Sequence, residues 1–432
     1  MSSRQFAHDL VDLLFDHVEQ IESRPSVEWR PFAELRELVR IDGTLSDPLE
    51  LSRMVARYAN QLHHPMYMGH QVCPPFMDAA AADFLISVMN QSTAVWEMSP
   101  IGTVIEKEVV RWLADRAGYP ESAEGTAVSG GSAANLTGLL AARARFDSNV
   151  VITSADAHYS IARAAAIMGV RDVRKVPTDA QHRMDVGALE EMLASLDTPP
   201  LAIVATCGST ATGAFDDLEA IASLRDRYNT WLHVDAAHGA SVLLSDSLAH
   251  LARGLDRADS LSWDPHKMLF LPLSLGTILV RDGIWLRRAF QADAPYLFNS
   301  AGASENIGEM TIQCSKRADA IKLWLLLKSR GTAPFVEAIE RVTRLTRYLY
   351  ERLNDSDDFE PLHEPQLNIL CFRRIGLDND ATADLRERLV RSGRAWITTT
   401  ILRDERVLRV TMMNPRTTES DVDGLLDALR DV

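Results

Sequence analysis

Six short apolar segments alternate with helical segments between residues 150 and 282, and this alternation is the feature that most constrains the fold. The segments are VVITS, VRKVPT, LAIVATC, WLHVDAA, SLSWD and GTILVRD. They resemble strands that are buried on both faces, because most of them are almost continuously apolar. Buried strands that alternate with helices form a mainly parallel sheet with helices on its faces. The sequence therefore predicts an α/β fold.

The chain on either side of these segments lacks this alternation. Residues 1–60 predict helices without strands, and the apolar residues from Phe6 to Ile21 recur at the spacing of an amphipathic helix. Such a helix needs cover from the body of the protein or from a partner subunit. We expect three parts, namely an N-terminal helical segment over residues 1–60, a large domain over residues 61–325 and a small α+β domain over residues 326–432.

The composition narrows the class of partner. The 45 basic and 60 acidic residues give a net charge of −15, and they form no basic stripe, which argues against nucleic acid and anionic membrane as partners. The four cysteines, Cys73, Cys207, Cys314 and Cys371, lie far apart and form no Cys-x-x-Cys pair. This spacing fits a reducing cytoplasm and suggests neither a disulfide framework nor a structural zinc site.

Unusual residues occur at several turns, where open parallel sheets bind their ligands. SGGSAAN, residues 129–135, is a turn of small residues that leads into a helix. The backbone N–H groups of such a turn can hold a phosphate, or the turn can simply be a tight connection with serine as N-cap. It lacks the Gly-Lys-Ser/Thr of a nucleotide-binding P-loop.

Two later turns carry candidate residues. His158 directly precedes a helix, so its imidazole can stack on a planar ligand or cap that helix. His233 and Asp235 share one face of an apolar strand, and a buried carboxylate needs a cation or strong donors, which a protonated ring nitrogen would supply. Alternatively, His233, Asp235 and His238 would bind a metal, although the sequence offers no His-x-x-x-His pair and no second carboxylate cluster.

Lys267 lies in DPHKMLF, where the acidic residue Asp264 precedes it and an apolar segment follows it. A buried ammonium is costly unless it is paired, neutralised or covalently consumed. One explanation is a salt bridge with Asp264, and the other is a Schiff base with an aldehyde. A phosphate-binding turn, a stacking ring, a buried aspartate and a buried lysine together match pyridoxal 5′-phosphate, which has one phosphate, one flat ring, one basic nitrogen and one aldehyde.

Seven motifs, in order, resemble those of the group II pyridoxal-phosphate-dependent amino acid decarboxylases. They are HHPMYMGH, NQSTAVWEMSPIGTVIEKEVVRWL, SGGSAANL, WLHVDAA, ADSLSWDPHK, TIQCSKRADAIKLWLLLKSRG and LRVTMMNP. The resemblance implies fold type I of the pyridoxal-phosphate-dependent transferases, which is aspartate aminotransferase-like and has a mainly parallel seven-stranded sheet. It also implies a cytoplasmic homodimer with swapped N-terminal segments and active sites at the subunit interface.

The resemblance also implies roles for individual residues. Lys267 would carry the cofactor covalently, Asp235 would pair with the pyridine nitrogen and His158 would stack on the ring, so these three would be catalytic. The other cofactor-binding residues would be Gly131, Ser132 and His266 at the phosphate, Ser209 near the phenolic oxygen, and Ala237. The substrate-binding residues would be Arg409, which receives a carboxylate, and His70 and Gln71, which border the pocket. The resemblance implies no metal.

The implied reaction is α-decarboxylation of an L-amino acid to the amine and CO₂, a carboxy-lyase reaction of amino acid metabolism. The alternatives are an aldehyde synthase, other chemistry at Cα, and a non-catalytic regulatory relative. The presence of both Lys267 and Asp235 disfavours the non-catalytic relative. The substrate stays open among small or medium acidic and aliphatic amino acids, 2,4-diaminobutyrate included.

Several positions depart from the family pattern. The loop tyrosine that helps to donate the Cα proton has no counterpart in FNSAGASENIGEMT, residues 298–311, and Tyr296 lies before this segment. The donor would then be His158 or water, or the product would be an aldehyde. His238 replaces a usual Tyr, Asp264 a common Asn and Lys316 a frequent Arg.

Overall fold

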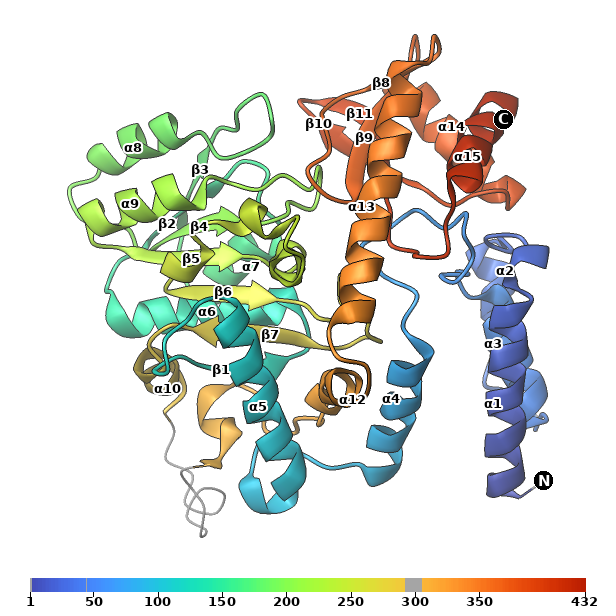
Figure 1. Cartoon of the computed structure of the whole chain (residues 1–432), viewed down its shortest axis with the longest axis horizontal. Coiled ribbons are helices and arrows are strands. Elements are labelled where there is room, and N and C mark those ends of the chain that lie inside the picture. The colour runs from blue at the N-terminus through green and yellow to red at the C-terminus, as the bar shows by residue number, and fades with distance from the viewer. Residues whose placement is uncertain (1, 44, 292–304) are drawn as a thin grey trace. The chain divides into compact units, whose positions relative to one another are not determined.

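The computed structural model describes residues 2–43, 45–291 and 305–432 (Figure 1). Contacts within the chain divide it into two compact units. Unit 1 comprises Met1–Val72, Val342–Glu364 and Asn368–Val432, and unit 2 comprises Cys73–Arg341 and Pro365–Leu367. The contacts thus group the N-terminal segment with the C-terminal α+β part. The three-part domain division expected from the sequence stays a prediction.

Unit 2 contains a seven-stranded sheet with the strand order β1-β7-β6-β5-β4-β2-β3. Its strands are β1 (Glu124–Val128), β2 (Val150–Ser154), β3 (Asp172–Val176), β4 (Ala202–Thr206), β5 (Trp231–Asp235), β6 (Ser260–Trp263) and β7 (Gly276–Val280). Strands β2 to β6 pair in parallel with one another, whereas β7 runs antiparallel to both β1 and β6. The predicted α/β fold with a mainly parallel seven-stranded sheet is confirmed, and the six apolar segments are β2 to β7.

Strand β1 is the one that the apolar pattern does not predict. Its sequence, EGTAV, contains a charged residue and a glycine, and both are depleted in strands. A Cβ on Gly125 would lie 2.3 Å from the carbonyl oxygen of Ile278 on β7, so glycine is required there. The close approach to β7, rather than intrinsic strand propensity, therefore defines this strand.

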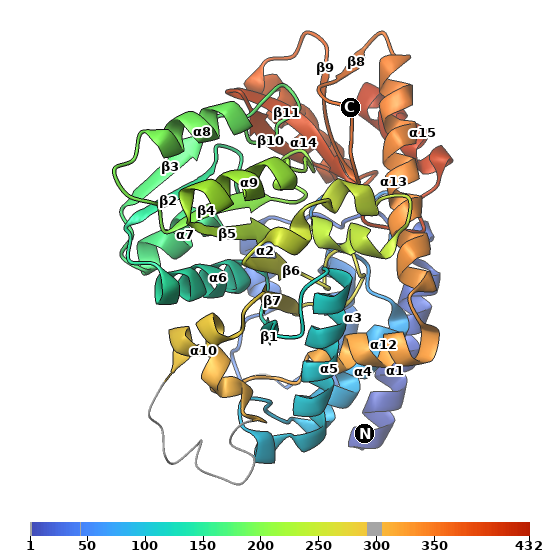
Figure 2. The ribbon, with the colours of Figure 1, turned by 60° about the vertical axis from the view of Figure 1, so that its left-hand side comes forward.

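Helices cover both faces of the sheet in unit 2. Helices α8 (Val186–Ala194) and α9 (Leu218–Tyr228) lie on one face, and α6 (Gly131–Arg145) lies on the other (Figures 1 and 2). Helices α8 and α9 each begin at an aspartate N-cap, Asp185 and Asp217 respectively, whose carboxylate accepts a backbone hydrogen bond from the first turn. Because both faces are covered, strands β4 and β5 are buried at every position.

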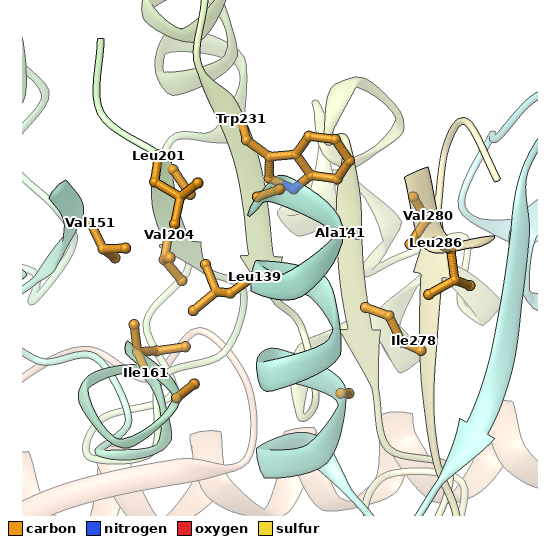
Figure 3. Packing of buried hydrophobic residues seen from close by; sticks show 14 of the residues in the cluster. Leu139, Ala141, Val151, Ile161, Leu201, Val204, Trp231, Ile278, Val280 and Leu286 are labelled. Atoms are coloured by element: carbon orange, nitrogen blue, oxygen red, sulfur yellow. The ribbon is translucent and has the colours of Figure 1, made fainter. Parts of the chain in front are cut away.

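The core that positions α6 lies between this helix and the strands. Leu139 and Ala141 of α6 belong to one buried cluster with Val204, Trp231 and Ile278 (Figure 3). Burying a large apolar side chain contributes about 1.5–3 kcal/mol, so this layer holds α6 firmly on the sheet. The other α-helices of unit 2 that the structure describes are α4 (Met77–Met89), α5 (Pro100–Arg116), α7 (Ser160–Ile167), α10 (Ile284–Phe290), α12 (Ala320–Arg330) and α13 (Ala333–Asn354), which continues into unit 1.

Unit 1 contains an antiparallel four-stranded sheet with the order β10-β11-β9-β8. Its strands are β8 (Phe359–Pro361), β9 (Ile369–Arg374), β10 (Thr398–Leu402) and β11 (Glu405–Thr411). Its helices, besides the end of α13, are α1 (Ser3–Glu19), α2 (Phe32–Leu38), α3 (Pro48–Tyr58), α14 (Asn379–Ser392) and α15 (Glu419–Asp431). The predicted N-terminal helix is confirmed. No described helix combines the length and apolar character that crossing a membrane requires. The cytoplasmic location stays a prediction.

Candidate active site

The polar residues predicted at turns gather at one edge of the sheet in unit 2. Asp235 is the last residue of β5, Ser209 follows β4, and Lys267 follows β6. Because β4, β5 and β6 are parallel, their carboxyl ends lie at the same edge. His158, which follows β2, also lies here, since the charges of Asp235 and Lys267 both act on it. This edge is where ligands of open α/β sheets bind.

The carboxylate of Asp235 is buried and is held by neutral donors. Its Oδ2 accepts a hydrogen bond from Nδ2 of Asn135 at 2.9 Å. Its Oδ1 accepts from Oγ of Ser262 at 3.1 Å and from the backbone N–H of Ala237 at 3.3 Å. Within the described part of the chain, none of these hydrogen-bond partners carries a positive charge. A protonated ring nitrogen would complete this environment.

His158 precedes α7 and is oriented by Ser160. Its Nδ1 lies 2.8 Å from Oγ of Ser160 and accepts the backbone N–H of the same residue at 3.3 Å. Burial lowers the pKa of His158, and the charge of Lys267 adds to this effect, while Asp235 opposes it. The imidazole is therefore neutral near pH 7, as suits a ring that stacks on another ring.

Lys267 is partly exposed at the edge of the core. Its Nζ is 3.3 Å from Oδ2 of Asp264, the salt bridge expected as one explanation for this lysine. Its side chain remains 20% exposed, whereas the following Met268 and Leu269 are fully buried. Because the side chain is not fully buried, Lys267 can pair with Asp264 and still react with an aldehyde.

The turn before α6 requires glycine at two positions. Gly130 has a φ of 151°, which favours glycine, and a Cβ on Gly131 would lie 2.9 Å from Cβ of Ala237. The backbone N–H of Gly131 donates to Oδ2 of Asp264 at 2.9 Å, and Ser132 is exposed at the start of the helix. The close backbone approach and the helix N-terminus suit this turn to an anion, and its role at the cofactor phosphate stays a prediction.

His266 and Ser209, two more of the predicted cofactor-binding residues, are positioned by neighbouring residues of unit 2. His266 lies beside the turn, because a Cβ on Gly130 would be 3.3 Å from its Cε1. Burial lowers the pKa of His266, and the charge of Asp264 opposes that effect. The Oγ of Ser209 lies 2.9 Å from Oγ1 of Thr212 and accepts from the backbone N–H of Ala214 at 3.2 Å. The role of Ser209 near the cofactor ring stays a prediction.

The metal alternative conflicts with the contacts of His233. Its Nε2 lies 3.0 Å from Oδ1 of Asn135, and its Nδ1 lies 2.8 Å from Oγ of Ser260. Both ring nitrogens are thus engaged, and neither has a lone pair directed at a metal. No three His, Cys, Asp or Glu side chains gather as metal ligands in the described ranges.

The residues expected to bind the substrate lie in unit 1. Arg409, on β11, is 5% exposed and donates from Nη1 to Oγ1 of Thr398 at 3.3 Å. Burial lowers the pKa of His70, and the charges of Arg409 and Arg386 lower it further. The side-chain nitrogen of Gln71 is buried and makes no hydrogen bond to a described residue. Unit 1 therefore contains the positive charges of Arg409 and Arg386 near His70, and a side-chain N–H of Gln71 that can donate a hydrogen bond to a ligand.

The segment without the loop tyrosine lies largely outside the described residues. FNSAGASENIGEMT is described only from residue 305 onward, and Tyr296 falls in the same undescribed range. The expectation that another group donates the Cα proton therefore stays a prediction.

The sequence motifs did not reveal the residue that connects Asp235 with His158. The motif SGGSAAN groups Asn135 with the anion-binding turn, whereas the structure places it inside α6 with its amide directed at Asp235 and Ser160. The signal that the sequence does offer is an amide among the apolar residues of a helix. A buried amide normally forms hydrogen bonds, so an asparagine at such a position indicates polar partners in the folded protein.

The arrangement fits pyridoxal 5′-phosphate. The turn at Gly131 can receive its phosphate, the buried carboxylate of Asp235 its basic nitrogen, and the amine of Lys267 its aldehyde. The neutral ring of His158 can stack on the flat ring. All four groups come from strand ends and the segments that follow strands at the same edge of the sheet.

Comparisons with known proteins agree with this chemistry. The pyridoxal-dependent decarboxylase conserved domain matches residues 50–375. An aromatic-L-amino-acid decarboxylase of Bacillus atrophaeus is 33% identical over 97% of this chain and 93% of its own length. An L-2,4-diaminobutyrate decarboxylase of Rhizobium meliloti (strain 1021) is 35% identical over 88% of this chain and 80% of its own.

A solved structure is similar over almost the whole chain. The crystal structure of mouse CSAD has a TM-score of 0.91 and 28% identity, and the match covers 99% of this chain and 98% of that one. The chain belongs to the pyridoxal-dependent decarboxylase family, and it is an amino acid decarboxylase, a lyase whose cofactor is pyridoxal 5′-phosphate.

Proposed function

We propose that the protein catalyses α-decarboxylation of an L-amino acid and releases CO₂ and the corresponding amine. The observation that carries this proposal is the single sheet edge that presents the buried carboxylate of Asp235, the amine of Lys267 and the anion-binding turn. The two relatives described above are decarboxylases, and the comparisons do not favour the alternative of an aldehyde synthase.

Each residue of the site has a task in this reaction. Bound pyridoxal 5′-phosphate supplies an electron sink for the electrons of the bond between Cα and the carboxylate. Asp235 holds a proton at the pyridine nitrogen through its buried oxygens, Lys267 binds the cofactor through Nζ, and His158 stacks on the ring and excludes water from that face. The residues that complete the cofactor site are Gly131, Ser132, Ser209, Ala237 and His266.

The charges in unit 1 favour a substrate with an anionic side chain. Arg409 receives a substrate carboxylate in this proposal, while His70 and Gln71 border the substrate. Arg409 and Arg386 both lie close enough to His70 to lower its pKa. Two positive charges near residues that border a substrate attract a carboxylate or sulfinate and repel an ammonium such as that of 2,4-diaminobutyrate.

The test of this function is product analysis with a panel of amino acids. The purified holoenzyme is incubated with aspartate, glutamate, cysteine sulfinate, 2,4-diaminobutyrate and phenylalanine, and CO₂ and products are measured by mass spectrometry. We expect equal amounts of CO₂ and amine, with kcat/KM for an acidic substrate at least about tenfold above that for 2,4-diaminobutyrate, which corresponds to about 1.4 kcal/mol. A preference for 2,4-diaminobutyrate would contradict the charge argument alone, whereas aldehyde in place of amine would contradict the proposed product.

We also propose a homodimer with active sites at the subunit interface, as the family resemblance implies. Helix α4 exposes Phe84, Leu85, Val88 and Met89 by 58%, 46%, 65% and 56% on one helical face, and such exposed apolar patches mark interaction sites. We expect sedimentation to give about twice the chain mass of 48.0 kDa, and Val88→Glu to lower that mass. The control Ile375→Glu, at an isoleucine of unit 1 that is 53% exposed, should not change it. A monomeric wild-type protein would contradict the proposal.

A further inference from the structure

We propose that Asn135 is a positioning residue that holds the carboxylate of Asp235 in place and fixes the tautomer of His158, an inference that rests on the decarboxylase site proposed above. Asn135 is fully buried in the first two turns of α6. Its Nδ2 donates to Oδ2 of Asp235 and to Oγ of Ser160, both at 2.9 Å, and its Oδ1 lies 3.0 Å from Nε2 of His233. One amide thus connects the partner of the pyridine nitrogen with the side chain that orients the stacking ring.

The partners of Asn135 determine which way its amide points. A carboxylate oxygen accepts hydrogen bonds, so the group that faces Asp235 is the NH₂ and the group that faces His233 is the carbonyl oxygen. Nε2 of His233 then carries the proton, and its Nδ1 accepts from Oγ of Ser260 at 2.8 Å. That hydroxyl in turn accepts Nε1–H of Trp231 at 2.8 Å. Burial lowers the pKa of His233 to about 4, so this imidazole is neutral.

The second proton of the Asn135 amide determines the state of His158. Oγ of Ser160 accepts that proton, which leaves its own hydroxyl hydrogen to donate to Nδ1 of His158 at 2.8 Å. The backbone N–H of Ser160 points at the same nitrogen. With two donors directed at Nδ1, the imidazole carries its proton on Nε2, and a second proton on Nδ1 would face both donors. The network therefore favours His158 as a neutral stacking ring and disfavours it as the proton donor to Cα.

The packing of α6 explains why Asn135 reaches these partners. Gly138, three residues further along the helix, faces His233, and a Cβ on Gly138 would lie 2.6 Å from both Cε1 and Nδ1 of that ring. The helix thus approaches β5 more closely than a residue with a side chain would allow. This close approach brings the short side chain of Asn135 within hydrogen-bond distance of both His233 and Asp235.

The test compares three variants with the wild-type protein. Asn135→Ala removes the amide, and Asp235→Ala removes the carboxylate that the amide holds. Thr137→Ala, on the same helix, is the matched control, because Thr137 is buried but its hydroxyl only returns to the carbonyl oxygen of Ala133. Nitrogen-15 NMR of the cofactor-free protein, labelled at histidine and assigned with His158→Gln, reports the tautomer of His158, and steady-state kinetics of the holoenzyme report kcat and KM.

We expect the wild-type His158 signals to show a single neutral form protonated at Nε2, and Asn135→Ala to move them toward a mixture of both tautomers. The same variant should lower kcat by about 10- to 100-fold, the size typical of residues that orient a catalytic group, with KM changed by less than about threefold. Thr137→Ala should change neither measurement. If Asn135→Ala does not fold, the isosteric Asn135→Asp serves instead, and its second carboxylate beside Asp235 should lower kcat at least as much.

The outcomes separate this inference from the proposed function. Unchanged His158 signals and unchanged kcat in Asn135→Ala, together with a large loss in Asp235→Ala, would overturn the role of Asn135 and leave the function intact. Equal losses in Asn135→Ala and Thr137→Ala would also overturn it, because they would indicate general damage to α6. Full activity in Asp235→Ala would overturn the proposed catalytic site, and with it the need to position that carboxylate.

Discussion

Replacing Lys267 with alanine is expected to abolish covalent attachment of the cofactor and to lower kcat by about three orders of magnitude or more. The side chain of Lys267 is partly exposed after β6, and its amine lies 3.3 Å from Oδ2 of Asp264, which also accepts the backbone N–H of Gly131. Borohydride reduction followed by peptide mass mapping measures the attachment directly. In the wild-type protein, the cofactor mass should appear on the peptide that contains Lys267.

The matched control for this experiment is Lys328→Ala. Lys328 is exposed near the end of α12, so its removal takes away the same charge without touching the site. We expect the control to keep both the modified peptide and the activity. If Lys267→Ala kept them as well, the salt bridge with Asp264 would be the whole explanation of this lysine.

Replacing Lys316 with methionine is expected to destabilise the protein by about 3–5 kcal/mol, because it leaves the charge of Glu106 buried without its partner. Glu106 is 1% exposed and Lys316 is 3% exposed, and Nζ of Lys316 donates to both carboxylate oxygens. Oε1 of Glu106 also accepts from Oγ1 of Thr126 and from the backbone N–H of Ala127, both at 2.9 Å, and Oε2 accepts from Oγ1 of Thr93 at 2.9 Å. Urea unfolding of the cofactor-free protein measures the change.

A double variant identifies buried charge as the cause. Glu106→Gln combined with Lys316→Met keeps an oxygen that accepts from Thr126 and Ala127 and removes both charges, so it should recover most of the lost stability. Arg394→Met is the surface control, because the pair of Arg394 and Asp431 is 43% and 64% exposed and contributes less than about 1 kcal/mol. Equal losses in the single and double variants would show that packing of the Lys316 stem, rather than charge, is responsible.

The parts of the fold that the sequence predicted are those in which local pattern and tertiary environment agree. Strands β4 and β5 are buried along their whole length, so their apolar runs are visible without knowledge of their neighbours. Strand β1 has no such pattern, because its glycine is required by the approach of Ile278 from a strand about 150 residues further along the chain. In the large sheet, the sequence therefore predicted β2 to β7 and missed β1, the strand that depends on a distant partner.

The same distinction applies to the site. Asp235 and Lys267 were predictable, because a charge within an apolar run needs a chemical reason wherever the run lies. The role of Asn135 was not, because it depends on the distance between α6 and β5, which Gly138 of the same helix allows to be short. Hydrogen-bond networks of this kind join residues about 100 positions apart in the chain, and no local spacing encodes them.

In the proposed site, the first turns of α6 would also select a cofactor by its length. Gly131 begins the helix at the anion-binding turn, and Asn135 contacts Asp235 four residues later, so the helical rise of 1.5 Å per residue separates the two by about 6 Å along the axis. A helix does not stretch, so this separation is constant. A movement of α6 along its axis would alter the grip on the phosphate and the partner of the ring nitrogen together, and a molecule with a longer or shorter arm between these two groups could satisfy only one end.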